Sequence, residues 1–130
     1  MKVMDRVDLR RNLGLLAGVV VFFMIAVMPV WAGAGNGNAK KGEKIVKTRK
    51  LGNCVACHYL PNVESPGNIG PNLVEVMQGY TLADRKDVTQ WIRDARKFNP
   101  HTIMPPFGTN KILTPKQIND VVAYLYTLKK

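Results

Sequence analysis

The chain contains two cysteines, Cys54 and Cys57, and a histidine, His58, follows the second one directly. Two thiols two residues apart with an imidazole next in the chain form the C-x-x-C-H pattern that attaches c-type haem. The thiols add to the two vinyl groups of the porphyrin, and the adjacent imidazole reaches the iron. The pattern predicts one covalent haem c, with thioethers at Cys54 and Cys57 and an axial iron ligand at His58.

Three other uses of these residues compete with haem. A disulfide between the two cysteines is possible in an oxidising compartment. A thioredoxin-like redox pair needs a βαβ context, and no strand pattern surrounds residues 40–70. Zinc could use both cysteines with His58 and His101, but adjacent Cys and His ligands fit the usual zinc spacing poorly. The residues therefore favour haem and leave zinc or a disulfide as the alternative.

A second axial ligand is expected on the other face of the iron, and Met is a common choice that raises the reduction potential. Met104 lies in NPHTIMPPFG, residues 99–108, where three prolines stiffen the chain through their fixed φ. Met77 lies in a segment that looks helical, and such a Met more often fills a core. Met104 is thus the predicted ligand, and His101, Met77 or an open position on the iron are the alternatives.

The N-terminal segment has the features of an export signal. Basic residues precede an uncharged stretch, an apolar run extends from Leu13 to Trp31, and small residues follow. This order predicts a secretory signal peptide over residues 1–32 and a mature domain over residues 33–130. A retained membrane anchor is the alternative, because the run approaches the roughly 20 residues that span a bilayer. Either interpretation places the domain outside the cytoplasm, and we expect a periplasmic protein.

The composition excludes several functional classes. The chain carries 19 Lys and Arg against 9 Asp and Glu, a formal net charge of +10, and residues 40–50 are especially basic. A basic surface favours anionic partners, but an exported chain without a nucleic-acid motif is not expected to bind DNA or RNA. The chain has no G-x-S-x-G, H-E-x-x-H or Walker motif, so we expect no catalytic site of its own. Three aspartates, Asp84, Asp87 and Asp94, are expected on a solvated helix face.

Three helices are predicted and no strand is convincing, so the fold class is all-α. The first covers residues 39–49 behind an N-cap at Asn38, and the second covers residues 84–97. The third begins at Thr114, where Pro115 and Gln117 complete a helix-start signal. Trp91, on the second helix, is expected in the core near the haem.

The order of these features resembles a class I cytochrome c across residues 33–130. The resemblance implies N- and C-terminal helices that cross around a covalent haem. It also implies a glycine at the crossing, for which Gly42 against Tyr124–Leu125 is the matching guess. The family's proline after the haem motif corresponds to Pro71, whose carbonyl would accept the imidazole N–H of His58 and tune the iron.

A closer resemblance rests on GNCVACH, PGNIGPNL, NPHTIMPPFG and LTPKQINDVVAYLYTL. Together they are similar to SoxX, the small mono-haem subunit of the sulfur-oxidation complex SoxAX. The resemblance implies a larger SoxA-type cytochrome as partner, a SoxYZ-type carrier protein whose cysteine is coupled oxidatively to thiosulfate, and a cytochrome c as electron acceptor. The chain would be the electron-transfer subunit of this L-cysteine S-thiosulfotransferase complex. A free-standing periplasmic cytochrome c shuttle is the alternative function.

Overall fold

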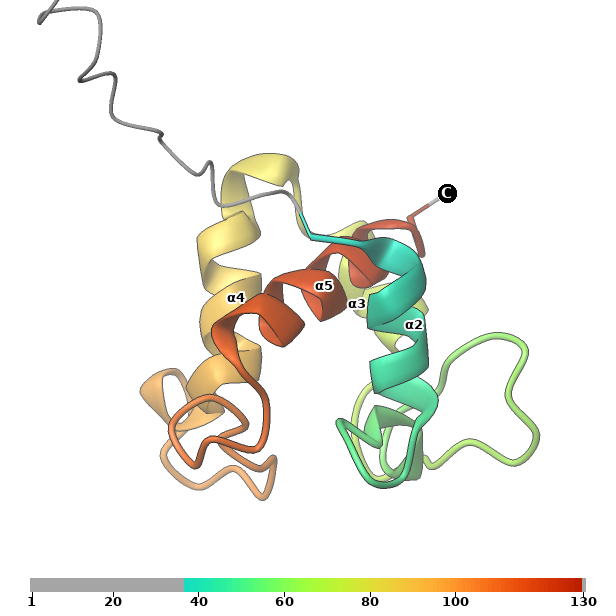
Figure 1. Cartoon of the computed structure of the whole chain (residues 1–130), viewed down its shortest axis with the longest axis horizontal. Helices are drawn as coiled ribbons and strands as arrows, with labels where there is room; N and C mark the ends of the chain where they lie inside the picture. The colour runs from blue at the N-terminus through green and yellow to red at the C-terminus, as the bar shows by residue number, and fades with distance from the viewer. Residues whose placement is uncertain (1–36, 130) are drawn as a thin grey trace, which may run out of the picture. The chain divides into compact units, whose positions relative to one another are not determined.

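The computed structural model describes residues 37–129, which belong to a compact unit formed by residues 34–130. The predictions of a signal peptide or anchor over residues 1–32 lie outside the described residues. Within residues 37–129 all regular structure is helical, which confirms the predicted all-α class (Figure 1). The elements are α2 (Ala39–Lys47), η1 (Cys54–Ala56), α3 (Leu73–Gln78), η2 (Leu82–Asp84), α4 (Arg85–Asp94), η3 (Ala95–Lys97) and α5 (Pro115–Tyr126).

Between Gly37 and Lys129, no helix has both the length and the apolar character needed to cross a lipid bilayer.

Helices α2 and α5 form the most extensive helix–helix contact of the domain and cross as expected (Figure 1). At the crossing, Gly42 lies so close to α5 that any side chain there would overlap the backbone carbonyl of Asp120, and its Cβ would lie 2.9 Å from Cβ of Tyr124. The Asn38 amide donates to the buried Asp120 carboxylate at 2.7 Å, which fixes the start of α2 against the same turn of α5. Gly42 therefore meets α5 between Asp120 and Tyr124, so the predicted contact with Tyr124 is present and extends one turn earlier along α5.

Helix α5 has the start signal that the sequence predicts. The Thr114 hydroxyl accepts from the Gln117 amide, the Gln117 side chain accepts from the Thr114 amide, and Pro115 takes the first helical position. These bonds satisfy amides that a helix start leaves without partners. The buried face that α5 presents to the core consists of Ile118, Val121, Val122, Tyr124 and Leu125.

The predicted end of the first helix differs from the structure. Helix α2 stops at Lys47 rather than at Arg49, because the Thr48 amide and hydroxyl turn back to carbonyls of the last turn. Helix α5 stops at Tyr126, so Lys129 does not lie in its last turn. The Lys129 ammonium instead donates to the backbone carbonyls of Met77 and Tyr80 and ties the C-terminus to the end of α3.

The crossing gives a direct test of how α2 and α5 are held. We expect Gly42→Ala to destabilise the folded protein by about 2 kcal/mol or more, because overpacking against a backbone carbonyl forces the helices apart. Gly79→Ala is the matched control, since a Cβ at Gly79 would meet only ordinary contacts at 3.5 Å and its φ of −78° suits alanine. Thermal unfolding of both haem-loaded variants measures the difference. Equal melting temperatures would contradict a close crossing.

Candidate haem-binding site

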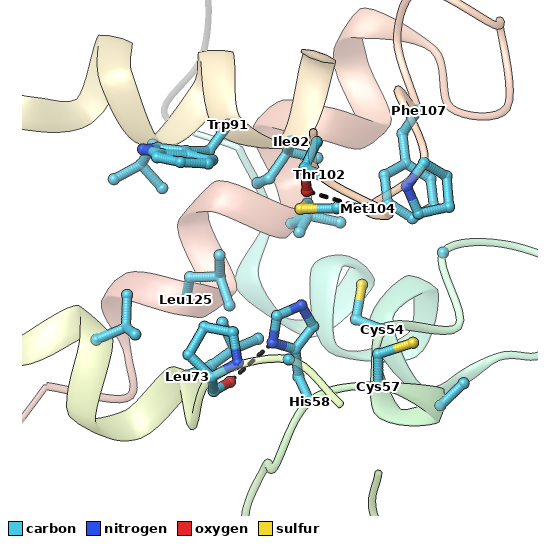
Figure 2. A pocket seen from close by; sticks show the side chains of 18 of the residues that line it. Cys54, Cys57, His58, Leu73, Trp91, Ile92, Thr102, Met104, Phe107 and Leu125 are labelled. Carbon is cyan, nitrogen blue, oxygen red and sulfur yellow. Dashed lines mark hydrogen bonds between the residues drawn. The ribbon is translucent and has the colours of Figure 1, made fainter. Parts of the chain in front are cut away.

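A largely apolar cavity of about 760 Å³ opens between the helices and the two long loops. This volume is within the range of roughly 300–1,000 Å³ that small-molecule and cofactor sites occupy. The haem motif forms one side of the cavity, α4 and the loop that carries Met104 form the opposite side, and α5 contributes Leu125 between them (Figure 2). The structure thus brings together residues from four separate parts of the chain.

The short helix η1 positions both thiols at the cavity. Asn53 enters it with a positive φ of 47°, and the amides of Cys57 and His58 both donate to the Cys54 carbonyl, at 3.2 and 2.9 Å. This tight turn directs the Cys54 and Cys57 sulfurs and the His58 ring into one region (Figure 2). Both thiols are free, so the disulfide alternative is not what this structure contains.

Burial raises the pKa of the Cys54 thiol to about 11. The group is therefore a protonated thiol at neutral pH, unlike the low-pKa thiolates of redox-active cysteines. Among residues 37–129, no three His, Cys, Asp or Glu side chains are grouped so that they could hold a metal ion. Neither observation supports the zinc or the thioredoxin-like alternative.

The His58 ring is held by the loop that follows the haem motif. Its Nδ1 lies 2.8 Å from the Pro71 carbonyl oxygen, and since a carbonyl only accepts, Nδ1 carries the proton. The other ring nitrogen, Nε2, is then left with its lone pair for a metal. Gly70 permits this arrangement, because a Cβ there would lie 2.5 Å from Cε1 of the ring. The loop is tied back to the motif, since the Gly70 amide donates to the Cys57 carbonyl at 2.8 Å.

Met104 lies across the cavity from His58 (Figure 2). Its amide donates to the Thr102 hydroxyl at 3.1 Å, which gives the loop a tight turn just before the thioether. Met77 also lines the cavity, but it is only 1% exposed and belongs to the core cluster. His101 is exposed and is not among the residues that line the cavity. Of the three candidates, Met104 is the one that lies opposite His58 in the cavity, and it remains the predicted ligand.

Trp91 lies on the same side of the cavity as Met104 (Figure 2). Its ring stacks on Phe98 with centroids 4.6 Å apart and planes inclined by 25°. Phe98 is exposed, so the pair extends from the cavity to the surface. Trp91 lines the cavity as expected, but it is only partly buried and does not belong to the core cluster.

Asp94 is a residue that sequence reasoning placed wrongly. It was expected on a solvated helix face, but it is 6% exposed and ends α4 with an extended φ of −164°. Its carboxylate accepts two bonds from the Arg96 guanidinium, both at 2.7 Å, and one from the Thr109 hydroxyl at 2.9 Å. The only sequence signal was Arg96 two residues later, a spacing that does not imply contact on a regular helix.

The Arg96 guanidinium beside Asp94 holds the pKa of that carboxyl well below its usual range. A lowered folded-state pKa means that the ionised group stabilises the fold above the unfolded-state pKa of about 3.9. That contribution is lost only as the pH falls toward the lowered value. The Asp94–Arg96 pair therefore stays ionised at neutral and mildly acidic pH.

Comparison with known proteins identifies the family. A model of the cytochrome c family matches residues 39–129. The chain belongs to the cytochrome c family. A cytochrome c of this kind binds haem c, and the family match confirms the class I fold predicted from the resemblance.

Two relatives refine the comparison. A chain in the crystal structure of SoxXA from P. pantotrophus is 34% identical and superimposes with a TM-score of 0.63, over 72% of this chain and 83% of that one. This likeness supports a SoxX-like cytochrome. An uncharacterized lipoprotein of Aquifex aeolicus (strain VF5) is 39% identical over 83 residues, which cover 59% of this chain. The match spans only 37% of the length of that curated relative.

The residues around the cavity fit a haem c. Two free thiols, an imidazole with a fixed proton, and a thioether on the opposite wall form the donor set that this cofactor uses. When bound, the haem supplies one-electron chemistry at its iron. The protein supplies the orientation of His58, the placement of Met104 and an apolar surrounding.

The two cavity methionines allow a matched test of the axial ligand. We expect Met104→Ala to keep its haem but to lose the absorption features of Met ligation and to lower the reduction potential, because a Met ligand raises it. Met77→Leu should leave the spectrum and the potential unchanged, since leucine conserves the volume of a core side chain. Spectroscopy and redox titration of both variants provide the measurement. A wild-type spectrum in Met104→Ala would exclude Met104 as the ligand.

Proposed function

We propose that this cytochrome is the mono-haem electron-transfer subunit of a SoxAX-like complex. One haem c is bound covalently through Cys54 and Cys57, and His58 and Met104 are its axial ligands. The observation that carries this proposal is the position of His58 and Met104 on opposite walls of one cavity, with both free thiols at its side. The likeness to a chain of SoxXA supports the assignment to this kind of complex.

Different residues of the site have different proposed roles in electron transfer. Pro71 holds the His58 ring in one orientation, so the imidazole does not have to reorganise when the iron changes its charge. Apolar side chains from α3, α4 and α5 surround the cofactor and lower the local dielectric, which influences the potential. We assign no general acid, base or nucleophile to residues 37–129 in this reaction, and the role proposed for the chain is that of an electron carrier.

Exposed apolar side chains at the edge of the cavity support the proposal of a stable protein partner. Ile69 and Ile103 both line the cavity, yet they are 68% and 80% exposed. They belong to the two loops that carry Gly70 and Met104, so an apolar rim lies on both sides of the opening. Such side chains gain stability when a partner covers them. The proposed occupant of this rim is a larger SoxA-type cytochrome.

The proposed reaction follows from this partnership. The complex would couple thiosulfate oxidatively to a cysteine of a SoxYZ-type carrier protein. The two electrons released would pass one at a time through the haem of this chain to a cytochrome c acceptor. This chemistry belongs to the periplasm, which is the location proposed for the exported domain.

A free-standing electron shuttle is the second candidate function. Helix α2 favours it, because Lys40, Lys41 and Lys44 are exposed there, while Lys47 pairs with Glu43 at 2.7 Å. An exposed basic face speeds encounter with acidic redox partners, and salt weakens it.

A haem-stained gel separates the two functions. The tagged protein is purified from the periplasm of its host grown on thiosulfate, and its intact mass is measured to count covalent haems. We expect one haem per chain and a second, larger haem-stained band identified as a cytochrome. A single band would favour the shuttle, and an unstained product would exclude covalent haem.

Substitutions in the apolar rim test whether the partner binds there. We expect Ile103→Asp to reduce recovery of the larger cytochrome about tenfold or more, because a buried unpaired charge costs several kcal/mol. Leu82→Asp is the control, since Leu82 is equally exposed, at 75%, but does not line the cavity. Equal recovery with both variants would place the partner elsewhere on the surface.

A further inference from the structure

The loop that carries Met104 is attached to the end of α4 at both of its own ends. On its N-terminal side, the amides of Phe98 and Asn99 donate to the Ala95 carbonyl at 3.0 Å. On its C-terminal side, the amides of Gly108 and Thr109 donate to the Arg93 carbonyl at 3.0 and 3.3 Å. The Met104 loop, residues 98–109, is therefore closed over three consecutive residues of the helix end.

Asp94 is the middle one of these three residues. Its side chain bonds to Arg96, just before the Met104 loop, and to Thr109, at the end of that loop. Its carboxylate accepts from the Thr109 hydroxyl at 2.9 Å and from the Arg96 amide at 3.2 Å. The Arg96 guanidinium completes the cluster with its two bonds at 2.7 Å. Asp94 and Thr109 are 15 positions apart in the sequence, so this contact is a tertiary link and not local helix chemistry.

The segment between Met104 and Thr109 is short, so a displacement of Thr109 is expected to displace Met104. Pro105 and Pro106 have a fixed φ, and the Phe107 amide donates to the Pro105 carbonyl at 2.9 Å. The Phe107 side chain is buried and lines the cavity. A shift at Thr109 therefore moves a short and stiff segment that ends at Met104.

We propose that Asp94 is a positioning residue for Met104, because its carboxylate holds Thr109 and thereby keeps the Met104 loop closed over the cavity. This inference rests on the proposed role of Met104 as the iron ligand. Asp94 lies outside the residues that line the cavity, so it acts only through the loop.

The physical basis is that Met104 can bind the iron only while its loop is closed. A loop opens locally with a free energy set by the contacts that tie it down. An external ligand such as imidazole binds the iron only when Met104 has left it. The apparent dissociation constant of imidazole is therefore inversely proportional to the population of the open loop, so a loop that opens more often binds imidazole more tightly.

The affinity of the ferric haem-loaded protein for imidazole tests the proposal. We expect Asp94→Asn and Thr109→Val to bind imidazole about tenfold more tightly than wild type, because each removes a hydrogen bond to a carboxylate. The asparagine amide has one acceptor oxygen in place of two, so it cannot keep all four bonds that the Asp94 carboxylate accepts from Arg96 and Thr109. Valine has the shape of threonine without its hydroxyl. Thr109→Ser restores the donor and is expected to return within about twofold of wild type.

The controls separate loop position from general stability. Asp87→Asn changes an exposed aspartate on the same helix and should leave the imidazole affinity unchanged. Amide hydrogen exchange at Gly108 and Thr109 should accelerate in Asp94→Asn and Thr109→Val while exchange in the core of α5 does not. If Asp94→Asn does not fold, the Thr109→Val and Thr109→Ser pair still gives the answer.

Two different failures are distinguishable. If Met104→Ala has the imidazole affinity of wild type, Met104 is not the ligand and the proposed site is wrong. If Met104→Ala binds imidazole tightly but Asp94→Asn and Thr109→Val match wild type, the ligand assignment holds and the positioning role of Asp94 is excluded. Equal tightening by Asp87→Asn would also exclude it, since the effect would then reflect charge alone.

Discussion

The close contact between α2 and α5 at Gly42 is the constraint on which the rest of the domain depends. With no side chain at position 42, the two backbones meet, and the Asn38 amide can reach the Asp120 carboxylate. This contact sets where α2 lies on α5, and the Gly52 amide, just before η1 with Cys54, donates to the Ile45 carbonyl of α2 at 3.1 Å. The contact at Gly42 also leaves Val121 and Leu125 of α5 available to line the cavity. The close approach of α2 and α5 at Gly42 therefore contributes to the position of the cavity.

The two sides of the cavity are held by different kinds of interaction. The His58 side is local: the ring, Gly70 and Pro71 belong to one loop that bonds back to the haem motif within 13 positions. The Met104 side is a long loop closed at its base by Asp94 and the neighbouring carbonyls. A local turn leaves few conformations for the imidazole, whereas a closed loop can open as a unit. The Met104 thioether is thus the proposed ligand whose position depends most on tertiary contacts.

The sequence allowed the local features to be predicted and not the tertiary ones. The C-x-x-C-H pattern and the start of α5 at Thr114 depend on neighbouring residues, so their spacing was sufficient. Met104 follows from the sequence because few other methionines lie beyond residue 32 and its own segment is rich in proline, but its position opposite His58 requires the fold. The burial of Asp94 could not be foreseen, because helical periodicity places it beside Asp87 and says nothing of Thr109. The contacts of Lys129 with α3 likewise depend on how distant segments pack.

The cofactor and the fold depend on each other in a domain of this size. A domain of fewer than about 100 residues has a limited core and gains stability from a staple or a buried group. Here many of the core side chains, among them Met77, Ile92 and Leu125, also line the cavity of about 760 Å³. Removing a single buried Leu side chain already costs roughly 3–5 kcal/mol where the space stays empty, and typical folding stabilities are only about 5–15 kcal/mol. A haem bound in this cavity would therefore complete the core as well as transfer electrons, and covalent attachment at Cys54 and Cys57 would keep it there whenever the Met104 loop opens.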